Sequence, residues 1–261
     1  MASHVFRNIL ITGASSGIGE GLARAYAQHG VTLFLSGQNE SRLNAVANVC
    51  RNLGAIAVPN PINVCDQTAM TQWIKNICTT HPLDLVIANA GISGGFAGQS
   101  LDQIADDYKI FDTNLNGVLN TIYPAIPTMA SQKSGQIVII SSLASFVPMP
   151  SAPAYAASKA AIRFYGEALA SKLAHHSISV SIICPGFIKS RMTEKNSFPM
   201  PFLMDTEAAV ALMKRKIDQK TPFFAFPFPM FLAVKLFTYL PSALTRIIFT
   251  RLPDKKNLPK A

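Results

Sequence analysis

Short apolar runs alternate with longer stretches of helical periodicity along most of this chain, and this alternation restricts the fold more than any other feature. The runs lie at Asn8–Ile11, Val31–Leu35, Ala55–Val58, Leu83–Ala88, Gln136–Ile140, Ser179–Ile183 and Phe223–Phe226. The helical stretches are Ile18–Gln28, Glu40–Leu53, Thr68–Thr79, Tyr108–Ser131, Ala154–Ala174 and Thr206–Gln219. Apolar runs separated by helices are typical of a buried parallel sheet. We therefore predict an α/β fold, a doubly wound sheet of about seven strands with helices on both faces.

No linker or change of composition interrupts this alternation before residue 226, so we expect a single domain over residues 1–226. The chain beyond it is first apolar with scattered cations and then polar and basic. We predict that residues 227–261 form a helical C-terminal extension rather than an independent domain.

The net charge of +9 belongs almost wholly to the end of the chain. Residues 213–261 carry 10 Lys or Arg and 2 Asp, whereas the rest of the chain is nearly balanced. A nucleic-acid-binding domain spreads basic residues along a recognition element, so we expect no nucleic-acid partner. Two apolar segments of this tail, Met230–Leu240 and Ser242–Leu252, carry cations that suit an anionic membrane surface. The alternative is that they pack on the core or on a partner subunit.

Several other classes of protein are excluded by simple counts. The four cysteines are scattered without a CxxC pair and the five histidines show no metal-ligand spacing, so we expect no metal. The longest uncharged apolar run, Thr221–Val234, has 14 residues and three prolines, which is too short to span a bilayer. The N-terminus has no features of an export signal. We therefore expect a cytoplasmic protein, with peripheral contact to a membrane surface left open.

A glycine-rich turn joins the first predicted strand to the first predicted helix. Gly13, Gly17 and Gly19 are spaced as GxxxGxG in the segment Thr12–Glu20. Such a turn lets backbone N–H groups and the positive end of a helix approach a pyrophosphate. A tight strand–helix connection also needs glycine without any ligand. Its place at the first junction of a parallel sheet favours a dinucleotide site.

Tyr155 and Lys159 are four residues apart in a predicted helix, so their side chains share one face. A cationic lysine beside a phenol lowers the pKa of the phenol and makes it usable as a general acid or base. Ser142 follows the fifth predicted strand, 13 residues before Tyr155, where the strand ends of an open α/β sheet line a ligand crevice. Together these residues predict an acid–base site at that edge.

From residue 8 to about residue 193 the sequence resembles the short-chain dehydrogenases/reductases, whose fold is of the Rossmann type. The matching elements occur in the family's order: Thr12-Gly13-(x)3-Gly17-Ile18-Gly19, Asn89-Ala90-Gly91, Asn114 in Thr113-Asn114-Leu115, Ser142, Tyr155-(x)3-Lys159 and Pro185-Gly186.

This resemblance implies a role for each catalytic candidate. Tyr155 would exchange a proton with a carbonyl oxygen, and Ser142 would orient the same oxygen. Lys159 would hold the nicotinamide ribose and lower the pKa of Tyr155. Asn114 would hold a water that connects Lys159 to solvent. Read singly, Asn114 can also be an ordinary buried amide and Ser142 an ordinary cap at a strand end.

The resemblance also implies an NAD(P) site. Asn89, Ala90 and Gly91 would line it near the adenine-side ribose, and residues 185–188 would cover the nicotinamide, with Ser190 on the carboxamide. The segment Leu35–Asn39 holds no acid to grip a ribose 2′-hydroxyl, so NADP is favoured over NAD. The full predicted cofactor set is Gly13, Ser15, Ser16, Gly17, Ile18, Gly19, Gln38, Asn63, Val64, Asn89, Ala90, Gly91, Tyr155, Lys159, Pro185, Gly186, Ile188 and Ser190.

The substrate follows less directly from the residues. The family sets it by the segment after Pro185-Gly186, a lid at about 187–219, and by the C-terminal region, and here both are rich in Phe and Met. Such a wall favours an apolar alcohol or ketone, such as an acyl chain, a sterol-like molecule or a xenobiotic. The same residues can instead pack the lid or a subunit interface. We predict an oxidoreductase that forms a homodimer or homotetramer; the alternative is a catalytically idle NAD(P)-binding regulatory or scaffold protein.

Overall fold

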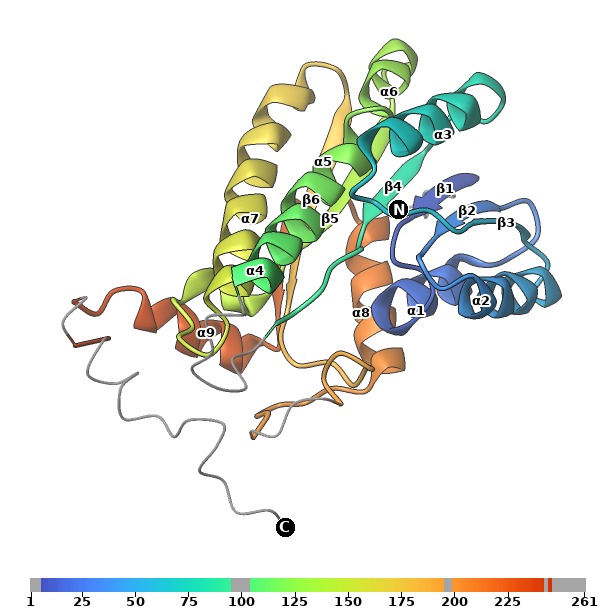
Figure 1. The fold of residues 1–261 in the computed structure, drawn as a ribbon. Helices are drawn as coiled ribbons and strands as arrows, with labels where there is room; N and C mark the ends of the chain where they lie inside the picture. The colour runs from blue at the N-terminus through green and yellow to red at the C-terminus, as the bar shows by residue number, and fades with distance from the viewer. Residues whose placement is uncertain (1–5, 95–103, 195–198, 242–243, 246–261) are drawn as a thin grey trace.

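The computed structural model describes residues 6–94, 104–194, 199–241 and 244–245. Seven parallel strands form one sheet in the order β3-β2-β1-β4-β5-β6-β7 (Figure 1). Their bounds are β1 Asn8–Ile11, β2 Thr32–Ser36, β3 Ile56–Asn60, β4 Leu85–Ala88, β5 Gly135–Ile140, β6 Ile178–Pro185 and β7 Phe223–Phe226. The predicted α/β fold of about seven strands is confirmed.

Helices cover both faces of the sheet because successive strand residues point to opposite sides. Ile9 and Ile11 of β1 pack with α1 (Gly17–Tyr26), α2 (Glu40–Asn52) and α8 (Thr206–Asp218). Leu10 belongs to the opposite layer, with α3 (Gln67–Thr80), α5 (Gly117–Ile122), α6 (Ile126–Gln132) and α7 (Pro153–Ala174). Figure 1 shows these two layers on either side of the strands. The five inner strands are thus buried on both faces, which explains their nearly continuous apolar sequences, whereas the edge strands β3 and β7 are partly exposed.

The strand order reverses at β1, which pairs with β2 on one side and β4 on the other. Ile11 aligns with Leu35 of β2 and with Ile87 of β4, so the three strands end at the same edge. The loops that follow them therefore meet at one place. In open α/β sheets, this reversal point at the carboxyl edge is where ligands bind.

The structure divides the helix predicted over Tyr108–Ser131. It contains α4 (Ile104–Phe111), a π-helical turn (Asp112–Asn116), α5 and α6. Pro124 and Pro127 lie at the break between α5 and α6, and because proline lacks a backbone N–H, a helix cannot run through them unbroken. The π-helical turn was not predicted, since apolar periodicity does not distinguish it from an α-helical turn.

The C-terminal extension begins with α9 (Phe228–Phe237), as the sequence predicted a helical segment there. It packs against β7 and a short 3-10 helix, η3 (Leu143–Phe146), through three aromatic rings. The ring centres of Phe146 and Phe231 are 5.5 Å apart, and those of Phe223 and Phe231 are 6.2 Å apart. The extension is therefore joined to the segment that follows β5, where the candidate site begins.

Within the described ranges, no helix is both long and apolar enough to cross a bilayer. In the same part of the chain, no three His, Cys, Asp or Glu side chains come together as a metal site. The four cysteines are free thiols, of which Cys50 and Cys184 are buried.

Candidate active site

The turn between β1 and α1 forms one wall of the site. Gly13 and Gly17 have positive φ angles of 66° and 58°, which glycine adopts without steric strain. A Cβ on Gly19 would lie 2.3 Å from the Gly13 carbonyl oxygen, so the turn can close only on glycine. The first N–H groups of α1 have no intrahelical acceptor, and together with the positive helix end they suit an anion. The turn therefore fits the pyrophosphate of a dinucleotide.

Thr12 and Asn89 tie the ends of β1 and β4 together. The Asn89 amide donates to the carbonyl oxygens of Thr12 and Gly13 at 3.0 and 3.3 Å. The Thr12 hydroxyl in turn accepts from the backbone N–H groups of Asn89 and Ala90, both at 3.2 Å. The Asn89 side chain thus holds the glycine turn in position. Sequence reasoning singled out Asn89 but gave Thr12 no role of its own.

The end of β2 gathers polar groups and no acid. The Ser36 hydroxyl and the Arg42 Nε are buried without a hydrogen-bond partner. Gln38 donates to Asn63 Oδ1 at 3.0 Å, and the same oxygen accepts from the Cys65 N–H at 3.1 Å. Of these polar side chains, Gln38 is among the residues that line the pocket, and its amide can donate to an oxygen of a bound ribose or phosphate.

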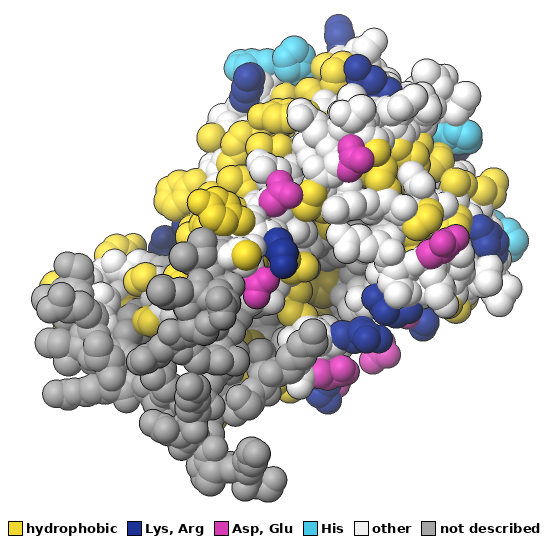
Figure 2. Space-filling model, in the orientation of Figure 1, with side chains coloured by type: hydrophobic (Ala, Val, Ile, Leu, Met, Phe, Trp, Pro, Cys, Tyr) yellow, Lys and Arg dark blue, Asp and Glu magenta, His cyan; other side chains and the backbone are white. Residues whose placement is uncertain are grey.

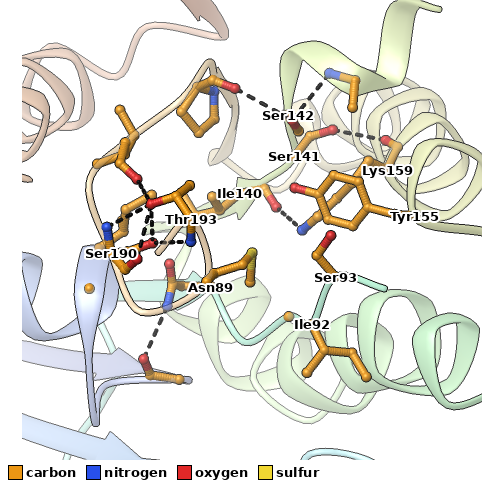
Figure 3. A pocket seen from close by; sticks show the side chains of 18 of the residues that line it. Asn89, Ile92, Ser93, Ile140, Ser141, Ser142, Tyr155, Lys159, Ser190 and Thr193 are labelled. Carbon is orange, nitrogen blue, oxygen red and sulfur yellow. Dashed lines mark hydrogen bonds between the residues drawn. The ribbon is translucent and has the colours of Figure 1, made fainter. Parts of the chain in front are cut away.

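Tyr155 lies on the inner face of α7, where it lines the pocket together with Ser142 at the end of β5 (Figure 3). Burial raises the pKa of Tyr155, the nearby Ser142 hydroxyl offsets part of this rise, and the nearby Cys184 thiol adds to it. The sequence led us to expect a lowered pKa through Lys159. Instead, burial is the largest cause and raises this pKa, so the phenol is protonated at neutral pH.

Ser142 also forms the cap of η3. Its Oγ accepts from the Ala144 N–H at 3.1 Å and lies 3.5 Å from the Pro185 carbonyl oxygen. The side chain that caps η3 therefore also lines the pocket that contains Tyr155.

Lys159 is buried one helical turn after Tyr155. Its Nζ donates to the Ile140 carbonyl at 2.9 Å and lies 6.0 Å from the centre of the Tyr155 ring. Burial lowers the pKa of Lys159 to about 8. Its backbone carbonyl accepts from the Ser141 hydroxyl at 2.8 Å, which fixes α7 against the end of β5. Lys159 is therefore mostly charged at neutral pH, about one pH unit below the midpoint of its titration.

Asn114 lies in the π-helical turn and is fully buried. Its Oδ1 accepts from the Ile92 N–H at 2.8 Å, and its Nδ2 donates to the Ile92 carbonyl at 2.9 Å and to Ser158 Oγ at 3.1 Å. The side chain therefore holds the segment after β4 against α7. Both amide hydrogens are used in this way, so the predicted water would have to use the second lone pair of Oδ1.

The segment after β6 folds over the glycine turn. Thr193 Oγ1 accepts from the Ser190 N–H at 2.8 Å and donates to the Ile188 carbonyl at 2.7 Å, which closes a compact loop (Figure 3). Ile188 forms a bridge with Met204. Sequence reasoning did not single out Thr193, although a Ser-x-x-Thr spacing is typical of such side-chain turns.

These walls enclose a pocket of about 510 Å³. Most predicted site residues line it: Gly13, Ser15, Ser16, Gly17, Ile18, Gln38, Val64, Asn89, Ala90, Gly91, Ser142, Tyr155, Lys159, Pro185, Gly186, Ile188 and Ser190. Three others, Gly19, Asn63 and Asn114, lie behind the lining and support it through the contacts described above.

The lid was predicted at about residues 187–219. Among the described residues, its contribution to the pocket lining comes from residues 187–193, whereas α8 packs on α1 and the sheet. Residues 195–198 lie outside the described ranges.

The far wall of the pocket is apolar and was only partly foreseen. Val147 and Met149 follow η3, Met192 lies in the lid, and Met230 and Val234 come from α9. A Cβ on Gly186 would lie 3.1 Å from Met230 Sδ, so α9 closely approaches the segment that follows β6. The Phe- and Met-rich composition predicted an apolar wall, but not which side chains form it.

Comparisons with known proteins agree with this geometry. A family model described as short chain dehydrogenase matches residues 7–199. An uncharacterized oxidoreductase of Myxococcus xanthus is 36% identical over 247 residues, which covers 94% of this chain and 96% of the relative. An 11-beta-hydroxysteroid dehydrogenase-like protein of Arabidopsis thaliana is 38% identical over 71% of this chain and 60% of its own.

Solved structures show the same fold. A 3-oxoacyl-[acyl-carrier protein] reductase from Brucella melitensis, with bound NAD, has a TM-score of 0.71 and 30% identity over 85% of this chain and 90% of that one. A short-chain dehydrogenase from Sphingobium yanoikuyae, in complex with NADPH, has a TM-score of 0.75 over 91% of this chain and 97% of that one, and at 23% identity it is similar in fold alone.

Proposed function

The chain belongs to the short-chain dehydrogenase family of oxidoreductases, and from this premise we propose that it interconverts a carbonyl and an alcohol with NADP or NAD. The observation that carries the proposal is that Ser142, Tyr155 and the buried Lys159 line one pocket, which begins at a glycine turn fitted to a pyrophosphate.

The chain's own residues divide the acid–base work. The bound nicotinamide supplies or accepts the hydride. Tyr155, protonated at neutral pH, donates its proton to the carbonyl oxygen in reduction and takes it back in oxidation. Ser142 orients that oxygen through a second hydrogen bond. Lys159, charged below a pKa of about 8, stabilises the phenolate that remains after the proton has left.

NADP is the favoured cofactor. The absence of an acid at the end of β2 removes the repulsion that a 2′-phosphate would meet there, and Ser36 and Arg42 each bring a buried polar atom without a partner. Backbone N–H groups of the glycine turn would hold the pyrophosphate, and Ser190 would contact the nicotinamide carboxamide. NAD stays the alternative, because the Gln38 amide donates to Asn63 and would have to give up this hydrogen bond in order to bind a phosphate.

The substrate class that the pocket supports best is an apolar ketone or alcohol. Met149, Met192 and Met230 give the pocket an adaptable apolar wall. Similar proteins include one named as hydroxysteroid dehydrogenase-like and one named as an oxoacyl reductase, which fits an extended apolar substrate.

Tyr155→Phe tests the catalytic assignment. The change removes the proton donor and keeps the ring, so turnover of any ketone found with NADPH should fall by about 10²–10⁴-fold while NADPH binding persists. Tyr165→Phe is the matched control, because Tyr165 is on the same helix and its hydroxyl donates to Tyr123 instead. A Tyr155→Phe protein with wild-type turnover would refute the assignment.

The rival function, a cofactor-binding protein without turnover, gives a different result in the same experiment. It requires NADPH binding together with no turnover by the wild type across a panel of ketones and alcohols. We also propose that the chain forms a homodimer or homotetramer, which light scattering of the purified protein measures directly, and that residues 1–226 form its catalytic domain.

A further inference from the structure

The helix α9 is apolar on both its faces. Nine of its ten residues are apolar, and Lys235 is the exception. One face, formed by Met230, Phe231 and Val234, contacts the pocket and the aromatic rings of η3 and β7. A helix with one polar face would need no further partner. A helix apolar all round is expected to have its second face covered as well.

The outward face of α9 is a continuous stripe. Phe228, Leu232 and Leu236 are spaced by four residues, and they are 67%, 45% and 59% exposed. In Figure 2, hydrophobic side chains are visible at the lower left, in the area where Figure 1 draws α9. Lys235 lies at the border of the stripe, with its Nζ 5.7 Å from the Phe146 ring.

The lid carries a second exposed apolar group at the same edge of the sheet. Met192, Phe202 and Leu203 are exposed in the segment that follows β6. Because β6 and β7 are parallel neighbours, the lid and α9 both leave the sheet at its carboxyl edge, and Figure 1 draws both at the lower end of the molecule. The pocket lies between them, since Met192 and Met230 both line it. The lid and α9, which carry the two exposed apolar groups, therefore both border the pocket.

The charge of the chain indicates what covers this surface. Residues 213–261 carry a net charge of +8 on the sequence, next to a nearly balanced remainder. An apolar stripe with Lys235 at its border, in a segment of positive net charge, is complementary to an anionic lipid surface, whereas two copies of this cationic segment would repel each other.

We propose that the surface formed by Phe228, Leu232 and Leu236 of α9, with Phe202 and Leu203 of the lid, docks on an anionic lipid bilayer. In this position the pocket opens toward the lipid, and an apolar substrate enters from the membrane rather than from water. The entry of substrate rests on the proposed function, whereas the docking itself does not.

The test is flotation of the full chain with vesicles of phosphatidylcholine alone or with phosphatidylserine, at low and high salt. The wild type should float with the anionic vesicles at low salt and less at high salt. The double variant Leu232→Ser/Leu236→Ser should lower the bound-to-free ratio by about tenfold or more, because two half-exposed leucines no longer enter the lipid. Leu53→Ser is the matched control, since Leu53 is 49% exposed at the end of α2 and should not affect binding.

Two results would overturn the proposal. Either the wild type stays with the soluble fraction in the presence of anionic vesicles at low salt, or the double variant floats as well as the wild type. Light scattering identifies the competing occupant: a wild-type dimer that the double variant converts to monomers assigns the stripe to a second copy of the chain and also overturns the proposal.

The proposal of vesicle binding and the proposal of catalysis can be refuted independently of each other. Leu232 and Leu236 do not line the pocket, so turnover of a short water-soluble ketone should be equal in the double variant and the wild type. Turnover of a ketone dissolved in anionic vesicles should fall with the bound fraction. If no ketone is turned over by the wild type, the proposed function is wrong, while flotation still decides the docking surface.

Discussion

At the residue scale, Lys159 is a buried cation, and burying a charge costs free energy. Its ammonium donates to one carbonyl oxygen, that of Ile140. Burial lowers the pKa of Lys159 from 10.5 to about 8. The unfolded chain therefore binds more protons at this residue between pH 8 and 10.5, so the contribution of Lys159 to stability becomes more favourable as pH rises through this window.

This sign leads to a prediction for Lys159→Met, which keeps most of the volume and removes the charge. The difference in unfolding free energy between wild type and variant should shift by about 1 kcal/mol in favour of the wild type between pH 7 and pH 9. Urea unfolding at both values measures it, and comparing the two proteins cancels the titration of the other groups. If the difference in unfolding free energy stays constant with pH, the pKa of Lys159 is not lowered in the folded protein.

Cofactor preference is decided by single side chains at the end of β2. Gln38→Arg adds a charged donor where Gln38 now contacts Asn63, so NADPH binding should strengthen by roughly 1–2 kcal/mol, with a smaller change for NADH. Fluorescence titration of both cofactors checks this. Gln28→Arg, which adds the same charge in an exposed position near the other end of α1, is the control. Equal gains for the two cofactors would count against a 2′-phosphate at Gln38.

At the scale of elements, the π-helical turn Asp112–Asn116 joins α4 to α5 and turns Asn114 inward. Asn114→Leu removes the three hydrogen bonds of a fully buried side chain and leaves the Ile92 N–H and carbonyl without their partner. We expect a loss of about 2–3 kcal/mol in unfolding free energy. Asn116→Leu makes the same change on an exposed residue of the same turn and should stay within about 0.5 kcal/mol of wild type. Denaturant unfolding measures both, and equal losses would exclude a special role for Asn114.

At the scale of the whole molecule, the glycine turn links cofactor binding to stability. NADPH at about 100 times its Kd should raise the unfolding free energy by about 2.7 kcal/mol, or the melting temperature by roughly 5–10 °C. Gly17→Ala should lose much of this shift, because a Cβ there points toward Ser190 across the site at 3.3 Å.

Gly30→Ala is the control for that experiment. Gly30 also has a positive φ, but a Cβ there meets nothing within 4 Å. If calorimetry finds the same NADPH-induced rise in melting temperature in both variants, Gly17 is not part of the NADPH-binding turn.

The sequence alone determined the features that depend on neighbours along the chain. Apolar runs of strand length, buried on both faces, specify a parallel sheet wherever they occur, so the seven strands were predicted to within a few residues. The Tyr155–Lys159 pair followed from helical spacing, and the glycine turn from its place between the first strand and the first helix.

Only the tertiary structure decided the features that depend on distant segments. The pKa directions of Tyr155 and Lys159 are set by burial, which arises when β5, β6 and α7 come together. Met230 and Val234 reach the pocket because β7 delivers α9 to the same edge as Ser142, across a separation of more than 80 residues in the chain. Local periodicity contains no information about such contacts, because the free energy that selects them comes from packing between segments rather than within them.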